Sequence, residues 1–250
     1  MVDKQKAQEL AEYFKKNPKE IINLYKSLKS QAGLVKWVQK SNQEWKEKKV
    51  DQKSKKQVEG WFKSTQNYIF ELMETQSTAK RKSLNRQIIR ICKQNNLKKI
   101  LDFGCGVGQN AIDAAKSNLT VTMADLPSKT LDFALWRAKR QKLNIKVIKI
   151  TSEKPLKKKY DAILTLEVFQ HLFNVKKTAT HLFDHLNKKG FLFSTTRFKN
   201  PTYLMALKSN YHLEKTFDQE LKKIGFIQKH KIYQWGNGQK SKYLYVFQKP

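Results

Sequence analysis

The chain has 250 residues, 39% of them hydrophobic, which is enough for a sizeable core and excludes global disorder. Its 51 Lys and Arg residues outnumber 21 acidic residues, and the net charge of +30 favours a polyanionic partner. Cys92 and Cys105 stand in unrelated contexts, which excludes a disulfide framework or a cysteine-based metal site. We expect a cytoplasmic protein without a membrane span, because the charged N-terminus precedes no apolar segment and no apolar run reaches ~18 residues.

Residues 1–97 have the apolar periodicity of helices. Helices are predicted in "KAQELAEYFKK" and "PKEIINLYKSLKS", separated at Asn17-Pro18, and in "GLVKWVQKSNQEWKEKK". The charged run "KEKKVDQKSKKQVEG" indicates a solvated helix end or connection. After Gly60, one further aromatic helix is predicted in "WFKSTQNYIFELMET".

Ser77 or Thr78 can cap a helix in "AKRKSLNRQIIRICKQNN", whose Leu84, Ile88 and Ile91 form one buried stripe. We place a domain boundary ahead of this helix. The expected division is a helical N-terminal extension over residues 1–76 and a second domain over residues 77–250.

From residue 98 the pattern changes to short apolar runs that alternate with amphipathic segments. The runs are "KKILDF" (98–103), "LTVTMAD" (119–125), "IKVIKI" (145–150), "YDAILTL" (160–166) and "GFLFSTT" (190–196). Segments long enough for crossover helices separate several of them, which predicts a parallel sheet covered on both faces. A helix in "LEKTFDQELKKIG" then precedes two strands around the turn "GNGQK". The predicted fold is an α/β three-layer sandwich with a mostly parallel seven-stranded sheet that ends in an antiparallel hairpin.

The turn "LDFGCGVGQN" after the first predicted strand carries Gly104, Gly106 and Gly108. In an open parallel sheet this turn lies at the carboxyl edge, where nucleotides and nucleosides bind. The dinucleotide fingerprint Gly-x-Gly-x-x-Gly does not fit, because Gln109 stands where its third glycine belongs and Asp102 occupies the strand. No Gly-Lys-Ser/Thr follows, which excludes a P-loop.

A ligand with a nucleoside and a cationic amino-acid end, without a pyrophosphate, fits this turn. Gly104 and Gly106 allow the backbone to approach a ligand closely. Asp102 can orient the amides of the turn or meet an ammonium group. About 20 residues on, "VTMADLP" ends the second strand with Asp125, where a carboxylate accepts from both ribose hydroxyls.

Residues 98–250 resemble the class I, Rossmann-like S-adenosylmethionine-dependent methyltransferases. "LDFGCGVG" resembles the first motif of that family, and "ADLPSKTLDFALWRAKR" resembles its second strand end and the following helix. "YDAILTLEVFQHL" resembles the fourth-strand motif, and "HLFDHLNKKGFLFSTT" the helix and fifth strand that follow. The resemblance implies a methyltransferase with S-adenosylmethionine as its cofactor.

The resemblance also implies which residues hold this cofactor. The ribose hydroxyls would meet Asp125, the adenine would pack on Leu126 and reach Ser152 or Glu153, and Glu167 would face the cofactor from the other side. The implied cofactor residues are Asp102, Gly104, Cys105, Gly106, Gly108, Asp125, Leu126, Ser152, Glu153 and Glu167.

His171, four residues beyond Glu167 in "EVFQH", is the predicted general base, with packing of a turn as the alternative. His181 and His185 lie four residues apart without a third ligand, so we expect a solvated helix face and no metal. The segments "WFKSTQNYIF" and "FKNPTYLMALKSNYH" (198–212) are expected to shape the acceptor pocket or to pack in the core.

The predicted methyl acceptor is a small metabolite, methylated on O, N or C. The fourth strand does not end in Asn/Asp-Pro-Pro-aromatic, which disfavours methylation of the exocyclic amine of a nucleic-acid base. The motif "EVFQH" resembles that of the methyltransferases that act on small metabolites. Only six of the basic residues are Arg and the Lys residues are evenly spread, which disfavours a dedicated nucleic-acid-binding protein. The net charge of +30 nevertheless leaves a tRNA-type substrate as an alternative. A non-catalytic cofactor-binding protein is a further alternative. An RNA substrate would require a basic rim, for which the candidates are Lys53, Lys55, Lys56, Lys80, Arg81, Lys82, Lys199 and Lys208.

Overall fold

The structure is a computed structural model that describes residues 3–27, 36–151, 156–235 and 242–250. The described residues form one seven-stranded sheet in the order β3-β2-β1-β4-β5-β7-β6. Its strands are β1 (Lys99–Phe103), β2 (Thr120–Asp125), β3 (Lys146–Lys149), β4 (Tyr160–Leu166), β5 (Leu186–Thr195), β6 (Ile227–Trp235) and β7 (Lys242–Gln248).

The first five strands pair in parallel, and β7 pairs antiparallel with β5 and β6. The predicted α/β fold is therefore confirmed. β5 begins at Leu186, four residues earlier than predicted, because Tyr160 already pairs with Leu186 across a bulge. The predicted turn "GNGQK" lies outside the described residues.

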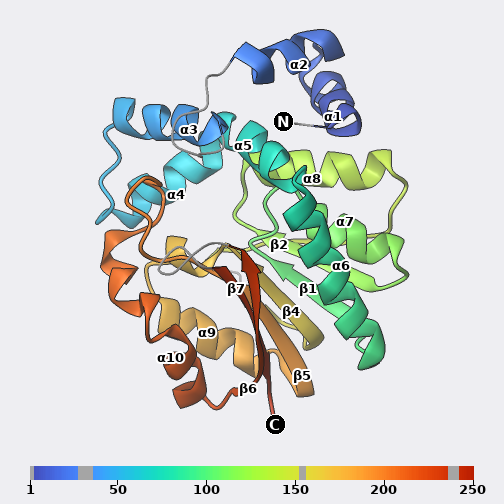
Figure 1. The fold of residues 1–250 in the computed structure, drawn as a ribbon, viewed down its shortest axis with the longest axis vertical. Helices are drawn as coiled ribbons and strands as arrows, with labels where there is room; N and C mark the ends of the chain where they lie inside the picture. Colours follow the sequence, from blue (N-terminus) through green and yellow to red (C-terminus); the bar gives the residue numbers. More distant parts are fainter. Residues whose placement is uncertain (1–2, 28–35, 152–155, 236–241) are drawn as a thin grey trace.

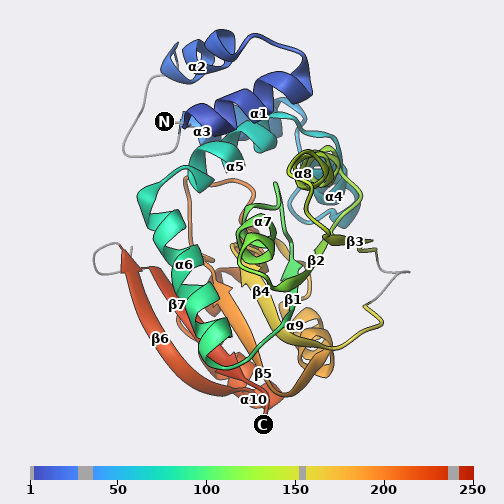
Figure 2. The same ribbon diagram turned by 90° about the vertical axis from the view of Figure 1, so that its right-hand side faces the viewer.

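Helices cover both faces of the sheet and complete the three layers (Figure 1). One face packs against α6 (Ala79–Gln94), α7 (Gln109–Lys116) and α8 (Lys129–Arg140), and Figure 2 shows α6 and α7 in front of the sheet. The other face packs against α9 (Val175–Asp184) and α10 (Phe217–Ile224). Two short 3₁₀ helices, η1 (Phe169–His171) and η2 (Lys208–Glu214), lie in the connections.

Helix α6 begins as predicted, because the Thr78 side chain accepts a hydrogen bond from the Arg81 amide. Its buried stripe consists of Leu84, Ile88 and Cys92, while Ile91 is only partly buried. In the described part of the chain, no helix combines the length and the apolar character needed to cross a bilayer.

The N-terminal helices gather at one end of the molecule (Figure 1). They are α1 (Lys4–Phe14), α2 (Pro18–Ser27), α3 (Lys36–Glu47), α4 (Lys55–Ser64) and α5 (Asn67–Gln76). The prediction of one helix after Gly60 is wrong. Ser54 caps α4 well before Gly60, and Thr65 adopts an extended conformation that ends α4 and separates it from α5. The Thr65 hydroxyl fixes this break by donating to Glu44 Oε2 in α3.

One buried ion pair joins α1 to the rest of the molecule. Arg137 of α8 donates from Nε to Glu9 Oε2 at 2.8 Å, and both side chains are almost fully buried. Its two other nitrogens donate to the Val107 carbonyl oxygen at 2.6 Å and to Gln109 Oε1 at 2.8 Å. A single guanidinium thus connects the N-terminal helices, the glycine turn and the start of α7.

We expect Arg137→Met to lower the free energy of unfolding by about 3–5 kcal/mol, because it leaves the Glu9 carboxylate buried without a counter-charge. The matched control is Arg140→Met, on the same helix. Arg140 pairs with Glu12 at a partly exposed site, where a surface ion pair contributes at most about 1 kcal/mol. Urea unfolding of the two variants measures the difference. Equal losses would contradict the role of Arg137 as the buried connection.

Candidate active site

The glycine turn between β1 and α7 has a left-handed backbone at all three glycines. The φ angles are +70° at Gly104, +53° at Gly106 and +73° at Gly108. A Cβ atom on Gly104 would lie 2.5 Å from Val168 Cγ2, and one on Gly108 would lie 2.8 Å from Met123 Sδ. Glycine is therefore required both by the conformation of the turn and by the close approach of its neighbours.

Asp102 holds this turn from beneath. It is buried, and its Oδ2 accepts a hydrogen bond from the Ala111 amide in the first turn of α7 at 3.1 Å. Burial raises the pKa of Asp102 to about 7, and the positive charge of Arg81 opposes that rise. This carboxylate orients an amide of the helix that follows the turn, one of the two roles predicted for it.

Asp125 holds the turn from the end of β2. Its Oδ2 accepts from the Gly106 amide at 2.8 Å, and its Oδ1 accepts from the Leu126 amide at 2.7 Å. Burial raises the pKa of Asp125 to about 6, against the lowering effect of these two amides, so the group is mainly ionised at pH 7. Each carboxylate oxygen can accept more than one hydrogen bond, which leaves capacity for the hydroxyl groups of a ligand.

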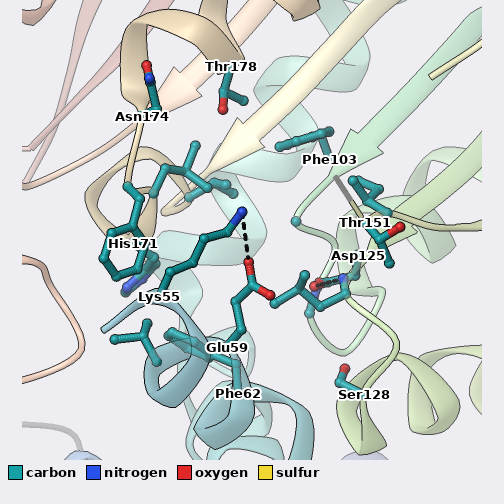
Figure 3. Close-up of a pocket in the computed structure, with 18 of the residues that line it drawn as sticks. Lys55, Glu59, Phe62, Phe103, Asp125, Ser128, Thr151, His171, Asn174 and Thr178 are labelled. Atoms are coloured by element: carbon teal, nitrogen blue, oxygen red, sulfur yellow. Dashed lines mark hydrogen bonds and ion pairs between the residues drawn. The ribbon is translucent and has the colours of Figure 1, made fainter. Parts of the chain in front are cut away.

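A cavity of about 440 Å³ lies at the carboxyl ends of the parallel strands (Figure 3), within the size range of small-molecule sites. We call its two parts the strand half and the helix half. The strand half is lined by the ends of β1 to β4 and includes Gly104, Gly106, Asp125, Leu126, Thr151 and Glu167. The helix half is lined by α4, α5, η1 and α9 and includes Lys55, Phe62, Tyr68, His171, Phe173 and Lys177.

The structure brings five of the ten predicted cofactor residues together in the strand half: Gly104, Gly106, Asp125, Leu126 and Glu167. Three others lie behind this lining rather than in it. These are Asp102, Cys105 and Gly108. The remaining two, Ser152 and Glu153, lie outside the described residues.

Glu167 has an unusual backbone at the end of β4. Its φ of +64° is uncommon for a residue with a side chain and costs of order 1 kcal/mol or more. Its carboxylate accepts from the Thr195 hydroxyl at 2.7 Å and from Gln170 Nε2 at 3.4 Å. These bonds hold an acidic group at the cavity wall in a strained position, which is typical of a binding site.

His171 lines the helix half and has a defined tautomer. Its Nδ1 lies 2.7 Å from the Met205 carbonyl oxygen, which can only accept, so Nδ1 carries the proton and Nε2 carries a lone pair. The ring lies edge-on to Phe62 and Tyr203, at 5.4 and 5.8 Å between centroids. Burial lowers the pKa of His171 below 6.5, so the imidazole is neutral at pH 7. Figure 3 shows it on the side of Lys55 and Phe62, across the cavity from Asp125.

In the two segments expected to shape the acceptor pocket, some side chains line the cavity and others pack behind its lining. Phe62 and Tyr68 line the cavity. Trp61 and Met205 are buried in the aromatic cluster beneath them, and Tyr203 donates from its hydroxyl to Glu71 Oε1 at 3.0 Å. Sequence periodicity shows that such aromatics face inward, but it does not distinguish a cavity wall from the core behind it.

The sequence predicts a solvated helix face for His181, and the structure differs from that prediction. His181 lines the cavity, and its Nε2 accepts from the Leu156 amide at 3.3 Å, while His185 Nδ1 donates to the His181 carbonyl oxygen at 2.7 Å. The described residues contain no group of three His, Cys, Asp or Glu side chains that could hold a metal ion.

Arg81 is a buried cation behind the cavity lining whose burial sequence reasoning missed. The prediction of Arg81 on an exposed basic rim is wrong, because the residue is 5% exposed in the first turn of α6. Its Nε donates to Gln76 Oε1 at 3.1 Å, and its charge interacts with Glu167 and Asp102. Its neighbours Lys80 and Lys82 are both exposed, so the local sequence did not indicate that Arg81 is buried.

A sequence model of the methyltransferase domain family matches residues 75–238 of the chain. The chain belongs to this methyltransferase family. The resemblance to class I S-adenosylmethionine-dependent methyltransferases that the glycine turn carries is therefore confirmed.

Similar proteins agree with this assignment. Ubiquinone biosynthesis O-methyltransferase from Rickettsia bellii (strain OSU 85-389) is 31% identical over 110 residues, which cover 43% of this chain and 46% of that protein. The chain thus spans about half the length of the curated relatives it matches. N-methyltransferase NodS from Bradyrhizobium japonicum WM9 superposes with a TM-score of 0.57 at 16% identity, over 70% of this chain and 99% of that one. Magnesium protoporphyrin IX methyltransferase (ChlM) from Synechocystis PCC 6803 superposes with a TM-score of 0.55 at 14% identity, over 88% and 100%. These two structures share the fold of this methyltransferase domain.

The glycine turn gives a prediction that needs no ligand. Gly104→Ala is expected to lower the free energy of unfolding by at least about 1–2 kcal/mol, because alanine is strained at φ +70° and its Cβ would contact Val168. The control is Gly60→Ala in α4, where a Cβ meets nothing within 4 Å and alanine should stabilise the helix by about 0.5–1 kcal/mol. Urea denaturation measures the free energy of unfolding of both variants, which should fall for Gly104→Ala and rise for Gly60→Ala. A neutral Gly104→Ala would show that the turn tolerates a side chain.

Proposed function

We propose that the protein transfers the methyl group of S-adenosylmethionine to an O, N or C atom of a small metabolite. The observation that carries the proposal is one continuous cavity between two side chains that backbone hydrogen bonds hold in place. At one end Asp125 is fixed by the amides of the glycine turn, and at the other His171 presents an unprotonated Nε2.

The strand half fits the cofactor. The Asp125 carboxylate can accept from the ribose hydroxyls, Leu126 lies next to it as an apolar surface for the adenine, and Gly104 and Gly106 leave room for the methionine part. Behind this lining, the buried positive charge of Arg81 interacts with Glu167 and Asp102. The bound cofactor would supply a methyl group on a sulfonium, which is already activated for displacement.

The helix half would hold the acceptor. A lone pair of the acceptor atom forms the bond to the methyl carbon, the carbon–sulfur bond breaks, and its electrons remain on sulfur. Where the acceptor carries a proton, His171 Nε2 can remove it, and the Met205 carbonyl oxygen fixes the ring while that proton is held. Phe62 and Tyr203 exclude water from the ring faces and edges.

Nothing in the described site favours a nucleic-acid substrate. Of the eight candidates for a basic rim, Arg81 alone is buried, and Lys55 lines the cavity while remaining exposed. The other six are exposed: Lys53, Lys56, Lys80, Lys82, Lys199 and Lys208. The RNA alternative, the cytoplasmic location and the division at residues 76 and 77 stay predictions from the sequence. We propose the small-molecule acceptor because the cavity and its base form one enclosed site.

Cofactor binding tests the strand half. S-adenosylhomocysteine should bind the protein in calorimetry, and Asp125→Asn should weaken binding by about 1–3 kcal/mol, because an amide cannot accept from both hydroxyls and the two backbone amides at once. Binding by the unaltered protein should also weaken as the pH falls through about 6, where Asp125 becomes protonated. Asp132→Asn, at an exposed position of α8, is the control. Unchanged affinity in Asp125→Asn would remove the proposed ribose contact.

Turnover tests the helix half. If His171 is the base, His171→Ala should reduce turnover by about 10²–10⁴-fold with little change in S-adenosylhomocysteine affinity. Since burial lowers its pKa, the acid limb of the pH–rate profile should lie below pH 6.5 and disappear in the variant. His212→Ala is the matched control, because His212 also bonds a backbone carbonyl through Nδ1 but is exposed. Full turnover in His171→Ala would leave the residue a packing role only.

A further inference from the structure

Charge is unevenly distributed along the cavity. The acidic groups of the strand half are Asp125 and Glu167, on the side proposed for the cofactor. The helix half carries the cations Lys55 and Lys177. Its one acid among the described lining residues, Glu59, forms ion pairs with Lys55 at 3.6 Å and Lys63 at 3.4 Å. The helix half therefore has an excess of positive charge.

Helix α4 forms one wall of the helix half with a single face. Lys55, Val58, Glu59 and Phe62 follow the spacing i, i+3, i+4 and i+7, and all four line the cavity. Figure 3 shows the Lys55 ammonium extending over the cavity to Glu59, and the Lys55 side chain stays 57% exposed. α4 precedes the residues that the family model matches, 75–238, so this wall is not part of the shared domain.

The facing wall contributes an apolar surface and a second cation. Phe173, just before α9, lines the cavity and stays 37% exposed, so its ring is accessible to a ligand. Lys177, in the first turn of α9, also lines the cavity, and its ammonium has no acidic partner in the described part of the chain. Phe62, Leu172 and Phe173 together give an acceptor apolar surface on which to lie.

We propose that the acceptor is an anionic aromatic molecule whose carboxylate is bound by Lys55 and Lys177. This inference rests on the proposed methyl transfer and adds the class of acceptor to it. The aromatic body packs against Phe62 and Phe173, which places a ring hydroxyl toward His171. The carboxylate competes with Glu59 for Lys55, so binding the acceptor shifts Glu59 toward Lys63.

Three matched phenols test this proposal on protein saturated with S-adenosylhomocysteine. They are 4-hydroxyphenylacetate, tyrosol and tyramine, which share a phenol ring and end in a carboxylate, an alcohol and an ammonium group. Calorimetry should show that the acid binds about 10–100-fold more tightly than the alcohol, the effect of a charge-assisted hydrogen bond, and that the amine binds weakest.

The lysines provide matched variants on the same two helices. Lys55→Met and Lys177→Met should each reduce the preference for the acid by about 10-fold or more and leave tyrosol affinity unchanged. Lys56→Met and Lys176→Met remove the same charge one residue away, at exposed positions outside the cavity, and should keep the preference. Thermal unfolding checks that all four variants are folded.

Each other outcome overturns the proposal. Equal affinity for acid and alcohol, preference for the amine, or no binding of any phenol would show that the helix half does not select a carboxylate. An equal loss in the control variants would assign the preference to net charge rather than to this site. S-adenosylhomocysteine binding separates the two levels: if it persists while the preference is absent, only the acceptor class fails, and if it is absent, the proposed methyl transfer fails as well.

Discussion

The buried guanidinium of Arg137 is the contact on which the cavity depends. It fixes α1 through Glu9, the glycine turn through the Val107 carbonyl oxygen and the start of α7 through Gln109. The N-terminal helices supply a wall of the cavity, so they must be held in register with the turn that supplies the opposite one. A buried charge with three partners is costly to break, because Glu9 and the Val107 carbonyl oxygen would each lose a hydrogen bond while buried.

The glycine turn is organised by carboxylates rather than by its own side chains. Asp102 bonds the amide of Ala111 beneath it, and Asp125 bonds the amide of Gly106 from the next strand. Burial raises the pKa of both acids, which means that keeping these carboxylates ionised in the folded protein lowers its stability. The result is a binding surface whose donors and acceptors are oriented before a ligand arrives.

The α4 wall of the cavity differs in origin from the strand half. The strand half belongs to the part of the chain matched by the methyltransferase family model, and its geometry follows from the ends of parallel strands. The wall formed by α4 belongs to the N-terminal helices, which this match does not include. Under the proposed function, the α4 wall would contact the acceptor and the strand half would hold the cofactor.

The sequence alone determined the strands, the glycine turn and the place of Asp125 at a strand end, because short apolar runs and glycines at fixed offsets are local signals. Only the tertiary structure decided which residues reach the cavity. Arg81 stands among exposed lysines in the chain but is buried, and Lys55 stands in a charged run but points into the site. Burial depends on what other elements pack against a residue. For Arg81 those elements carry Asp102 and Glu167, which lie far away in the sequence, where no local pattern could indicate them. Lys55 stays exposed and lines the cavity from the start of α4.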